Sequence, residues 1–236
     1  MSSRKLSPSH ARCRALVDFD GTIAPDDPTD RLFERFADPL WREIEDAWQT
    51  GQISSRECMA RQVELLRATP AELDEEIGKV RIDPAFHSFL RFCWRHDVEA
   101  IVVSDGFDRV VRAVLEGAGI AIPFFANRLE WQGGDRWRLT FPYSQSDCRV
   151  SGANCKCSHG VGRGYRSAVA IGDGRSDFCM ATRADFVIAK GTLAGFCRSR
   201  GLAHQTFAGF DEATAHLARW LVSDGVGAGA SATSAV

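Results

Sequence analysis

Four short apolar runs recur along the chain, and each ends at polar residues or glycine. They cover residues 15–18, 99–104, 168–172 and 186–189. Runs of this length, bounded in this way, are typical of strands buried on both faces of a parallel sheet. Apolar residues at helical spacing follow or separate them, in residues 107–119, 176–183, 193–200 and 211–222. The alternation predicts an α/β fold with a right-handed, doubly wound parallel sheet.

A long insertion separates the first two predicted strands. It is about 80 residues long, far more than a crossover usually needs. No strand pattern occurs in residues 29–82, whereas helical patterns cover residues 30–37, 40–50, 54–67 and 70–79. Ser54 followed by Glu57 is a capping box, and Pro70 with Glu72 marks another helix start. We expect a helical cap over the crevice of the sheet, after which residues 83–96 return to the main domain.

Alternating residues on either side of Gly133 and Gly134 predict a β-hairpin flap over residues 124–143. The expected domain organisation follows from these patterns. It comprises an α/β catalytic core of residues 14–28 and 83–222, a helical cap of residues 29–82, a flexible tail of residues 1–13 and a disordered tail of residues 223–236. The last tail is nearly all Gly, Ala and Ser, which cannot form a core.

The charge balance gives no global field that would attract a polyanion. Lys and Arg number 29 against 31 Asp and Glu, and the formal net charge is −2. We therefore expect no nucleic-acid partner and no membrane partner. No apolar run approaches the roughly 20 residues of a membrane helix, and the polar, basic N-terminus lacks the apolar stretch of a secretory signal. A cytoplasmic protein is expected, with its oligomeric state open, a homodimer included.

Eight cysteines in a chain without a secretory signal are expected to be thiols. Half of them lie in helical patterns and are predicted to be apolar core residues: Cys58, Cys93, Cys179 and Cys197. The others include Cys148, Cys155 and Cys157, with His159 nearby. These four residues could hold zinc, although their spacing lacks the usual C-x2-C knuckle. A thiol-rich loop beside the active site is the preferred interpretation.

Two carboxylates stand where the first apolar run ends. In an alternating strand, Asp18 and Asp20 point to the same side. Core packing gives no reason for two such charges, whereas a divalent cation or a proton shared in catalysis would give one. Ligands of doubly wound sheets bind at the carboxyl ends of the strands. Because Ser104 and Asp173 also fall at strand ends, we expect three separate regions of the chain to converge on one crevice.

Four motifs in these regions resemble those of the haloacid dehalogenase superfamily of phosphatases. Residues 18–22 (DFDGT) are similar to its motif one, and residues 102–106 (VVSDG) to motif two. Lys156 falls where the motif-three lysine is expected, and residues 171–177 (IGDGRSD) match motif four. The motifs occur in the order typical of the family, within a resemblance that covers roughly residues 14–220. It implies a Rossmann-like core.

The resemblance implies phosphate-ester hydrolysis through an aspartyl-phosphate. Asp18 would attack phosphorus, Asp20 would protonate the leaving alkoxide and then take a proton from water, and Lys156 would stabilise the transition state. The transferring phosphate would be bound by Thr22, Ser104, Asp105 and Gly106. An exposed surface lysine is the alternative for Lys156, because the glycines that follow it disfavour the helix usual in the family.

The resemblance also implies Mg²⁺ as the cofactor. The Asp18 carboxylate, the Asp20 backbone carbonyl and Asp173 would hold the ion, and Asp177 would stand behind them. The alternative for Asp177 is a carboxylate that favours a helix N-terminus. A small-molecule phosphate ester is the expected partner. A phosphomutase and a phosphate-accepting signalling module are the alternative functions.

The cap resembles the phosphoserine phosphatase branch and, within it, the methionine-salvage phosphatases. These act on 2-hydroxy-3-keto-5-methylthiopentenyl-1-phosphate, and residues 37–41 and 48–59 carry the likeness. Phosphoserine and phosphocholine or phosphoethanolamine phosphatases of the same branch stay as alternatives. Asp26 and Asp27 could bind an amino group, or cap a helix. The large apolar residues of the cap could face the crevice or form its own core: Trp41, Trp48, Met59 and Leu66.

Overall fold

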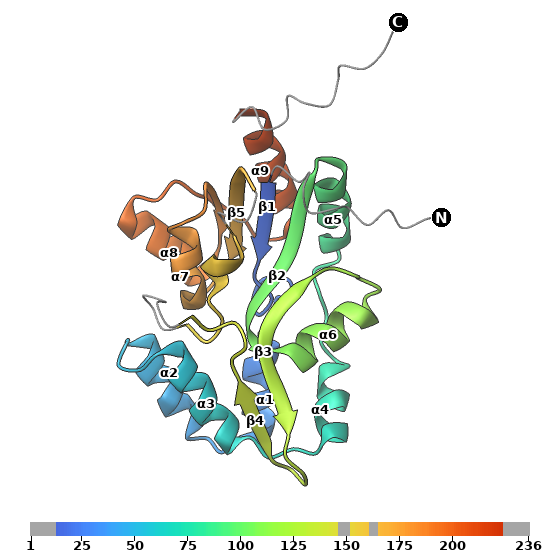
Figure 1. Ribbon diagram of the computed structural model, residues 1–236, viewed down its shortest axis with the longest axis vertical. Coiled ribbons are helices and arrows are strands. Elements are labelled where there is room, and N and C mark those ends of the chain that lie inside the picture. Colours follow the sequence, from blue (N-terminus) through green and yellow to red (C-terminus); the bar gives the residue numbers. More distant parts are fainter. Residues whose placement is uncertain (1–12, 146–151, 161–164, 224–236) are drawn as a thin grey trace, which may run out of the picture.

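The four predicted strands form the centre of one sheet. The computed structural model describes residues 13–145, 152–160 and 165–223 (Figure 1). The central strands are β1 (Cys13–Val17), β2 (Val98–Phe107), β5 (Ser167–Gly172) and β6 (Phe186–Ala189). They pair in parallel, in the order β2-β1-β5-β6, and every residue of β5 is buried. The predicted doubly wound α/β fold is confirmed.

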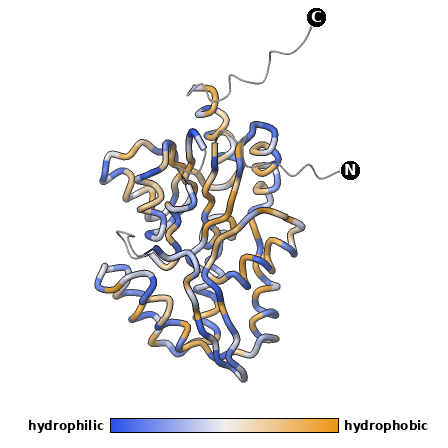
Figure 2. Tube along the Cα trace, in the orientation of Figure 1, coloured by the Kyte–Doolittle hydropathy of each residue, from blue (hydrophilic) through white to orange (hydrophobic). Residues whose placement is uncertain are grey.

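Helices cover both faces of this sheet. Side chains that alternate along β1 enter different clusters, so that Ala15 and Val17 belong to the main core while Leu16 faces Ile101 and Met180. Against one face pack α5 (Phe86–Arg95), α6 (Asp108–Gly117) and α9 (Phe210–Ser223), and on the other lie α7 (Phe178–Ala181) and α8 (Gly191–Arg200). The most hydrophobic stretches of the trace are the central strands (Figure 2).

The insertion between β1 and β2 is helical, as predicted. It comprises α1 (Pro28–Phe36), α2 (Trp41–Gln49), α3 (Ser55–Leu65) and α4 (Pro70–Ile77), and we call it the helical insertion. In Figure 1 it lies beyond the end to which β1 points. Ser54 accepts a hydrogen bond from the Glu57 N–H, but the complete capping box forms one helix later, between Thr69 and Glu72.

The predicted hairpin forms, and it is also part of the main sheet. Strands β3 (Phe124–Trp131) and β4 (Trp137–Thr140) are antiparallel around Gly133 and Gly134, whose φ values of 98° and 57° favour glycine. Strand β3 also pairs in parallel with β2, so the hairpin extends the main sheet. The Trp137 indole N–H donates to the Ala68 carbonyl (2.7 Å), which ties the hairpin to the helical insertion.

Other differences from the predictions are local. Residues 175–177 form a 3₁₀ turn, so α7 is a single turn rather than a helix over 176–183. A two-residue edge strand, β7 (Gln205–Thr206), was not expected because both residues are exposed and carry no pattern. Cys13 is buried in β1 and Ser223 ends α9, while the rest of the predicted tails lies outside the described residues. Among the helices of the described ranges, none has the length and apolar character needed to cross a bilayer.

Candidate active site

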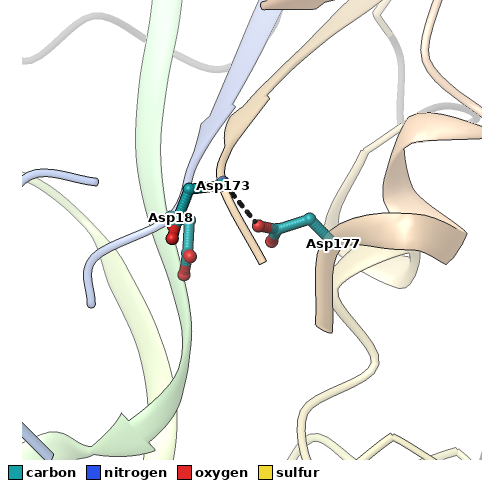
Figure 3. A group of neighbouring side chains, drawn as sticks. All are labelled: Asp18, Asp173 and Asp177. Carbon is teal, nitrogen blue, oxygen red and sulfur yellow. Dashed lines mark hydrogen bonds between the residues drawn. The ribbon is translucent and has the colours of Figure 1, made fainter. Parts of the chain in front are cut away.

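The sheet register brings the predicted strand-end residues together. Strand β1 lies between β2 and β5, with Val17 aligned to Val102 on one side and to Ile171 on the other. Asp18, Ser104 and Asp173 follow these aligned positions by one or two residues. One oxygen each from Asp18, Asp173 and Asp177 lies within 4.8 Å of the others, the arrangement drawn in Figure 3. Of the residues predicted to converge, Asp18 and Asp173 therefore lie together, and Asp177 joins them.

Lys156 lies at the centre of this group. It begins a short 3₁₀ helix, Lys156–His159, and is only 3% exposed. Its ammonium donates to Asp18 Oδ1 and Asp177 Oδ1, both at 2.7 Å, and to Ser176 Oγ at 2.9 Å. Burial alone would lower the pKa of Lys156, but the charges of Asp177 and Asp18 outweigh it and raise the pKa. The alternative of a solvated surface lysine is wrong.

Asp177 is fully buried and both of its oxygens are used. Oδ1 accepts from Lys156, and Oδ2 accepts from the backbone N–H groups of Asp173 (3.1 Å) and Gly174 (3.2 Å). A Cβ at Gly172 would lie 2.2 Å from Asp177 Oδ2, so glycine is needed for this close approach. Asp177 therefore fixes the turn after β5 and orients the lysine, which is more than a charge at a helix start requires.

Asp20 does not belong to the three grouped carboxylates. Its Oδ2 accepts from the Ser104 hydroxyl and its Oδ1 from the Thr29 hydroxyl, both at 2.8 Å. A Cβ at Gly106 would lie 2.6 Å from Asp20 Oδ2 and 2.6 Å from Thr29 Oγ1. The two aspartates that are neighbours in sequence thus have different environments, one ion-paired and one hydrogen-bonded by hydroxyl groups. Thr29 was not among the predicted site residues, because a helix-start threonine carries no distinctive signal.

Among the residues predicted to bind phosphate, Asp105 and Gly106 line the cavity beside the carboxylates, whereas Thr22 and Ser104 are buried behind it. Thr22 Oγ1 donates to Asp173 Oδ1 at 2.7 Å, and the Gly106 N–H donates to Ser104 Oγ at 2.8 Å. The Asp105 side chain turns instead toward the helical insertion. That Thr22, Ser104, Asp105 and Gly106 contact a phosphate stays a prediction.

The three grouped carboxylates fit a hard divalent cation. Burial, followed by the charge of Asp177, raises the pKa of both Asp18 and Asp173. Lys156 supplies one positive charge to a site with three carboxylates. Carboxylate oxygens are the ligands that Mg²⁺ prefers. A bound divalent cation would therefore relieve the excess negative charge, and the donor set suits it. The Asp20 carboxylate is not part of this group, and the predicted ligation by its backbone carbonyl is untested.

A cavity of about 230 Å³ opens between these residues and the helical insertion. Asp18, Asp20 and Asp173 line its floor, while Phe33, Trp48, Met59 and Gln62 are among the residues of the insertion that line the opposite wall. Trp48 and Met59 thus face the crevice, as one of the two interpretations had it. Trp41 and Leu66 belong instead to the hydrophobic core.

The wall of this cavity is acidic. Asp27, Asp30 and Glu45 line it from the helical insertion and the loop before α1. Asp27 Oδ1 accepts from the Asp30 N–H at 2.9 Å, so it caps the helix as well. Burial and neighbouring acids raise the pKa of Asp27 well above its ordinary value, and burial with the charges of Glu45 and Asp20 raises that of Asp30 to about 7. Asp30 and Glu45 had not been predicted, because acidic residues on a short helix usually face solvent.

The thiols gather differently from the proposed zinc site. Cys157 Sγ lies 3.6 Å from Cys155 Sγ and 3.4 Å from Cys179 Sγ. The His159 ring bonds the Asn154 side chain at 2.9 Å. Cys148 lies outside the described residues. Within the part of the chain that the structure describes, the residues grouped closely enough for one ion are Asp18, Asp173 and Asp177.

Comparison with known proteins adds to the geometry. The model of the haloacid dehalogenase-like hydrolase family matches residues 15–182. A protein of Exiguobacterium sp. strain AT1b, named 2-hydroxy-3-keto-5-methylthiopentenyl-1-phosphate phosphatase, is 31% identical over 208 residues, or 86% of this chain and 95% of the relative. A protein of the same name from Geobacillus kaustophilus is 30% identical over 203 residues, or 83% and 90% of the two chains.

Solved structures share the fold. A phosphoserine phosphatase, solved as an analogue of its phospho-aspartyl intermediate, is 20% identical with a TM-score of 0.62, covering 90% of this chain and 98% of its own. The phosphoserine phosphatase of T. onnurineus is 18% identical with a TM-score of 0.65, covering 90% and 97%. Given the family match from residue 15 to 182 and relatives this similar over most of its length, the chain belongs to the haloacid dehalogenase-like hydrolase family.

Proposed function

We propose that this protein is a Mg²⁺-dependent phosphatase that hydrolyses a small-molecule phosphate monoester through an aspartyl-phosphate. The observation that carries the proposal is the separation of two neighbouring aspartates into two roles. Asp18 is buried and ion-paired to Lys156 at 2.7 Å, whereas the Asp20 carboxylate receives hydrogen bonds from two hydroxyl groups. A nucleophile and a proton-transfer group need such different environments.

The reaction proceeds in two displacements. Lys156 binds Oδ1 of Asp18, so Oδ2 attacks phosphorus while the bond from phosphorus to the ester oxygen breaks. Asp20 gives its proton to that oxygen, and the alcohol leaves. The Asp20 carboxylate then takes a proton from a water molecule, whose oxygen bonds to phosphorus as the bond to Asp18 breaks. Inorganic phosphate leaves, and both aspartates return to their starting states.

The other residues hold charge during these displacements. Asp18 and Asp173 would hold Mg²⁺ with Asp177 behind them, and the ion, when bound, neutralises charge on the phosphoryl oxygens. The positive charge of the Lys156 ammonium stabilises the negative charge on the same oxygens in the transition state. Ser104 and the backbone N–H groups of Asp105 and Gly106 bind the transferring phosphate. Thr22 holds Asp173 in place through its hydroxyl hydrogen bond at 2.7 Å.

The alcohol part of the ester occupies the cavity under the helical insertion. A methionine-salvage enol phosphate, 2-hydroxy-3-keto-5-methylthiopentenyl-1-phosphate, is the first candidate. Relatives of 30 and 31% identity bear the name of its phosphatase. The lining by Phe33, Trp48 and Met59 suits a methylthio tail, because aromatic rings and a thioether make favourable contacts with sulfur.

An ester with a cationic group, such as phosphoserine or phosphocholine, is the second candidate. The specific observation in its favour is the acidic wall of Asp27, Asp30 and Glu45. Burial and then repulsion from neighbouring acids raise the pKa values of Asp27 and Asp30, and an ammonium group placed there would offset that repulsion. A neutral alcohol would not.

The experiment begins with Asp18→Asn, which removes the nucleophile and keeps the size of the side chain. Turnover of p-nitrophenyl phosphate with Mg²⁺ should be abolished, whereas the exposed Asp46→Asn, outside the cavity, should leave it unchanged. Retained activity in Asp18→Asn would contradict the mechanism. Specificity constants for the enol phosphate, phosphoserine and phosphocholine then rank the substrates. Isomerised sugar phosphate in place of free phosphate would indicate a phosphomutase, and an acyl-phosphate that survives for minutes would indicate a signalling module.

A further inference from the structure

Three segments that are distant in sequence meet at the Asp105 carboxylate. Asp105 stands near the end of β2. Its Oδ2 accepts from the hydroxyl of Ser55, the first residue of α3, at 2.5 Å. Its Oδ1 accepts from the backbone N–H of Asn154 at 3.1 Å. Asp105 therefore connects the helical insertion to the loop that carries Lys156.

Asn154 anchors that loop to the sheet. Its side chain is 3% exposed and donates to the Ser104 carbonyl at 3.0 Å and the Phe125 carbonyl at 2.8 Å. The backbone carbonyl of Asn154 accepts from the backbone N–H of Lys156 at 2.8 Å. The side-chain contacts fix Asn154 on β2 and β3, and the Asp105 contact fixes its backbone two residues before the lysine. The position of Lys156 thus depends on Asn154 being held.

A carboxylate at this position has an electrostatic cost. It borders the crevice proposed to receive a phosphate dianion, and burial raises its pKa. A carboxylate can receive a hydroxyl and a backbone N–H at once, one on each oxygen, without presenting a donor of its own. Both Asp105 oxygens are used in this way, by donors from two different segments. The geometry accounts for the carboxylate as a connecting group.

We propose that Asp105 is a positioning residue that couples the seating of the helical insertion to the placement of Lys156. The inference rests on the proposed function, which gives Lys156 its role. When α3 moves away from the sheet, the hydrogen bond from Ser55 to Asp105 breaks. The Asp105 carboxylate is then no longer held in the position where it accepts from the Asn154 backbone N–H. The lysine is then aligned on Asp18 only while the insertion covers the cavity. Transfer to water before the alcohol is enclosed is thereby disfavoured.

Amide hydrogen exchange on the free protein tests the coupling without any assay of activity. Ser55→Ala removes the donor on α3, and Ser54→Ala is the matched control, because Ser54 caps the same helix without contacting Asp105. Ser55→Ala should raise exchange about tenfold both in the first turn of α3 and over residues 154–159. Ser54→Ala should raise it in α3 alone. If Ser55→Ala, like Ser54→Ala, leaves amide exchange over residues 154–159 unchanged, the proposal is wrong.

Substitutions at Asp105 give the second arm. In Asp105→Asn, the amide oxygen can accept from the Asn154 N–H while the amide group donates to Ser55, whose hydroxyl can rotate to accept. We expect amide exchange over residues 154–159 in this variant within about threefold of the wild type. Asp105→Ala removes both bonds and should lower kcat for p-nitrophenyl phosphate at least tenfold, as loss of hydrogen bonds to a charged group implies. Wild-type kcat in Asp105→Ala would contradict the coupling.

The outcomes distinguish a failure of the coupling from a failure of the proposed function. If Asp105→Ala does not fold, the exchange patterns of Ser55→Ala and Ser54→Ala still decide the proposal. If the wild type hydrolyses no phosphate ester, the proposed function fails, while the exchange pattern of Ser55→Ala and Ser54→Ala still shows whether the segments are coupled.

Discussion

Replacing Lys156 with methionine tests whether one buried cation holds the acidic site together. Lys156→Met keeps an unbranched side chain of similar length but removes the ammonium that binds Asp18 and Asp177 at 2.7 Å. Both carboxylates are almost fully buried, with side-chain exposures of 5% and 0%. Without metal, no other basic side chain of the described residues forms an ion pair with them. The variant therefore leaves uncompensated buried charge.

The size of the effect follows from the burial. Removing one partner of a buried ion pair costs about 3–5 kcal/mol, out of a total stability of about 5–15 kcal/mol. The carboxylates can reduce this cost by taking up protons, since burial and Asp177 already raise the pKa of Asp18 and Lys156 lowers it. Without the lysine, the folded-state pKa rises further above the unfolded value. The loss of stability is therefore largest above that pKa and shrinks as the pH falls through it.

Urea unfolding of metal-free protein at pH 5 and pH 8 measures the loss. The matched control is Lys79→Met, since Lys79 is 44% exposed and pairs with Glu75 and Glu76 rather than with the acidic group. We expect Lys156→Met to lose about 3–5 kcal/mol at pH 8, clearly less at pH 5, and to regain part of it with Mg²⁺. An equal loss at both pH values would refute the electrostatic reasoning and leave packing as the cause.

Two further predictions concern the cavity. Gly106→Ala would place a Cβ 2.6 Å from Asp20 Oδ2 and from Thr29 Oγ1. It should lower kcat for p-nitrophenyl phosphate about 100-fold through misplacement of the acid, while Gly117→Ala, whose Cβ meets nothing within 4 Å, should not. Asp30→Asn removes a carboxyl whose pKa is about 7 against an ordinary 3.8. Burial and neighbouring acids raise this pKa in the folded state, so wild-type stability falls as the pH rises from 3.8 to about 7. The variant should therefore gain about 2–4 kcal/mol at pH 8 and little at pH 4 in urea unfolding. A gain independent of pH would contradict this cause.

The core of the site could be predicted because parallel strands place their ends at one edge of a sheet. Asp18, Ser104 and Asp173 each follow a buried apolar run, so their convergence needed no knowledge of side-chain packing. Lys156 was harder to assign, since it sits in a short 3₁₀ helix among glycines rather than at the start of a regular helix. Its place in the order of the four motifs pointed to it, whereas the residues around it did not.

The wall of the cavity could not be predicted. Glu45 and Asp30 lie on short amphipathic helices, where an acidic residue normally faces solvent. They line the cavity because α1–α3 are seated over the carboxyl ends of the strands, and sequence periodicity does not fix that seating. Asn154 was missed for a similar reason. A lone asparagine in a loop has no pattern, and its role depends on two carbonyls from β2 and β3 that reach it from elsewhere in the chain.

The charge state of Asp30 separates the two candidate substrates. With a pKa of about 7, its carboxyl is protonated below neutral pH and charged above it. The protonated form can donate to the keto or hydroxyl oxygen of the enol phosphate, whereas the charged form attracts an ammonium group. Hence the ratio of KM for the enol phosphate to KM for phosphocholine should rise, by up to about tenfold, between pH 6 and pH 8. Ionisation of the phosphate and of the catalytic groups affects both esters and cancels in the ratio. In Asp30→Asn the ratio should not depend on pH, and a wild-type ratio that is equally flat would show that Asp30 does not face the alcohol.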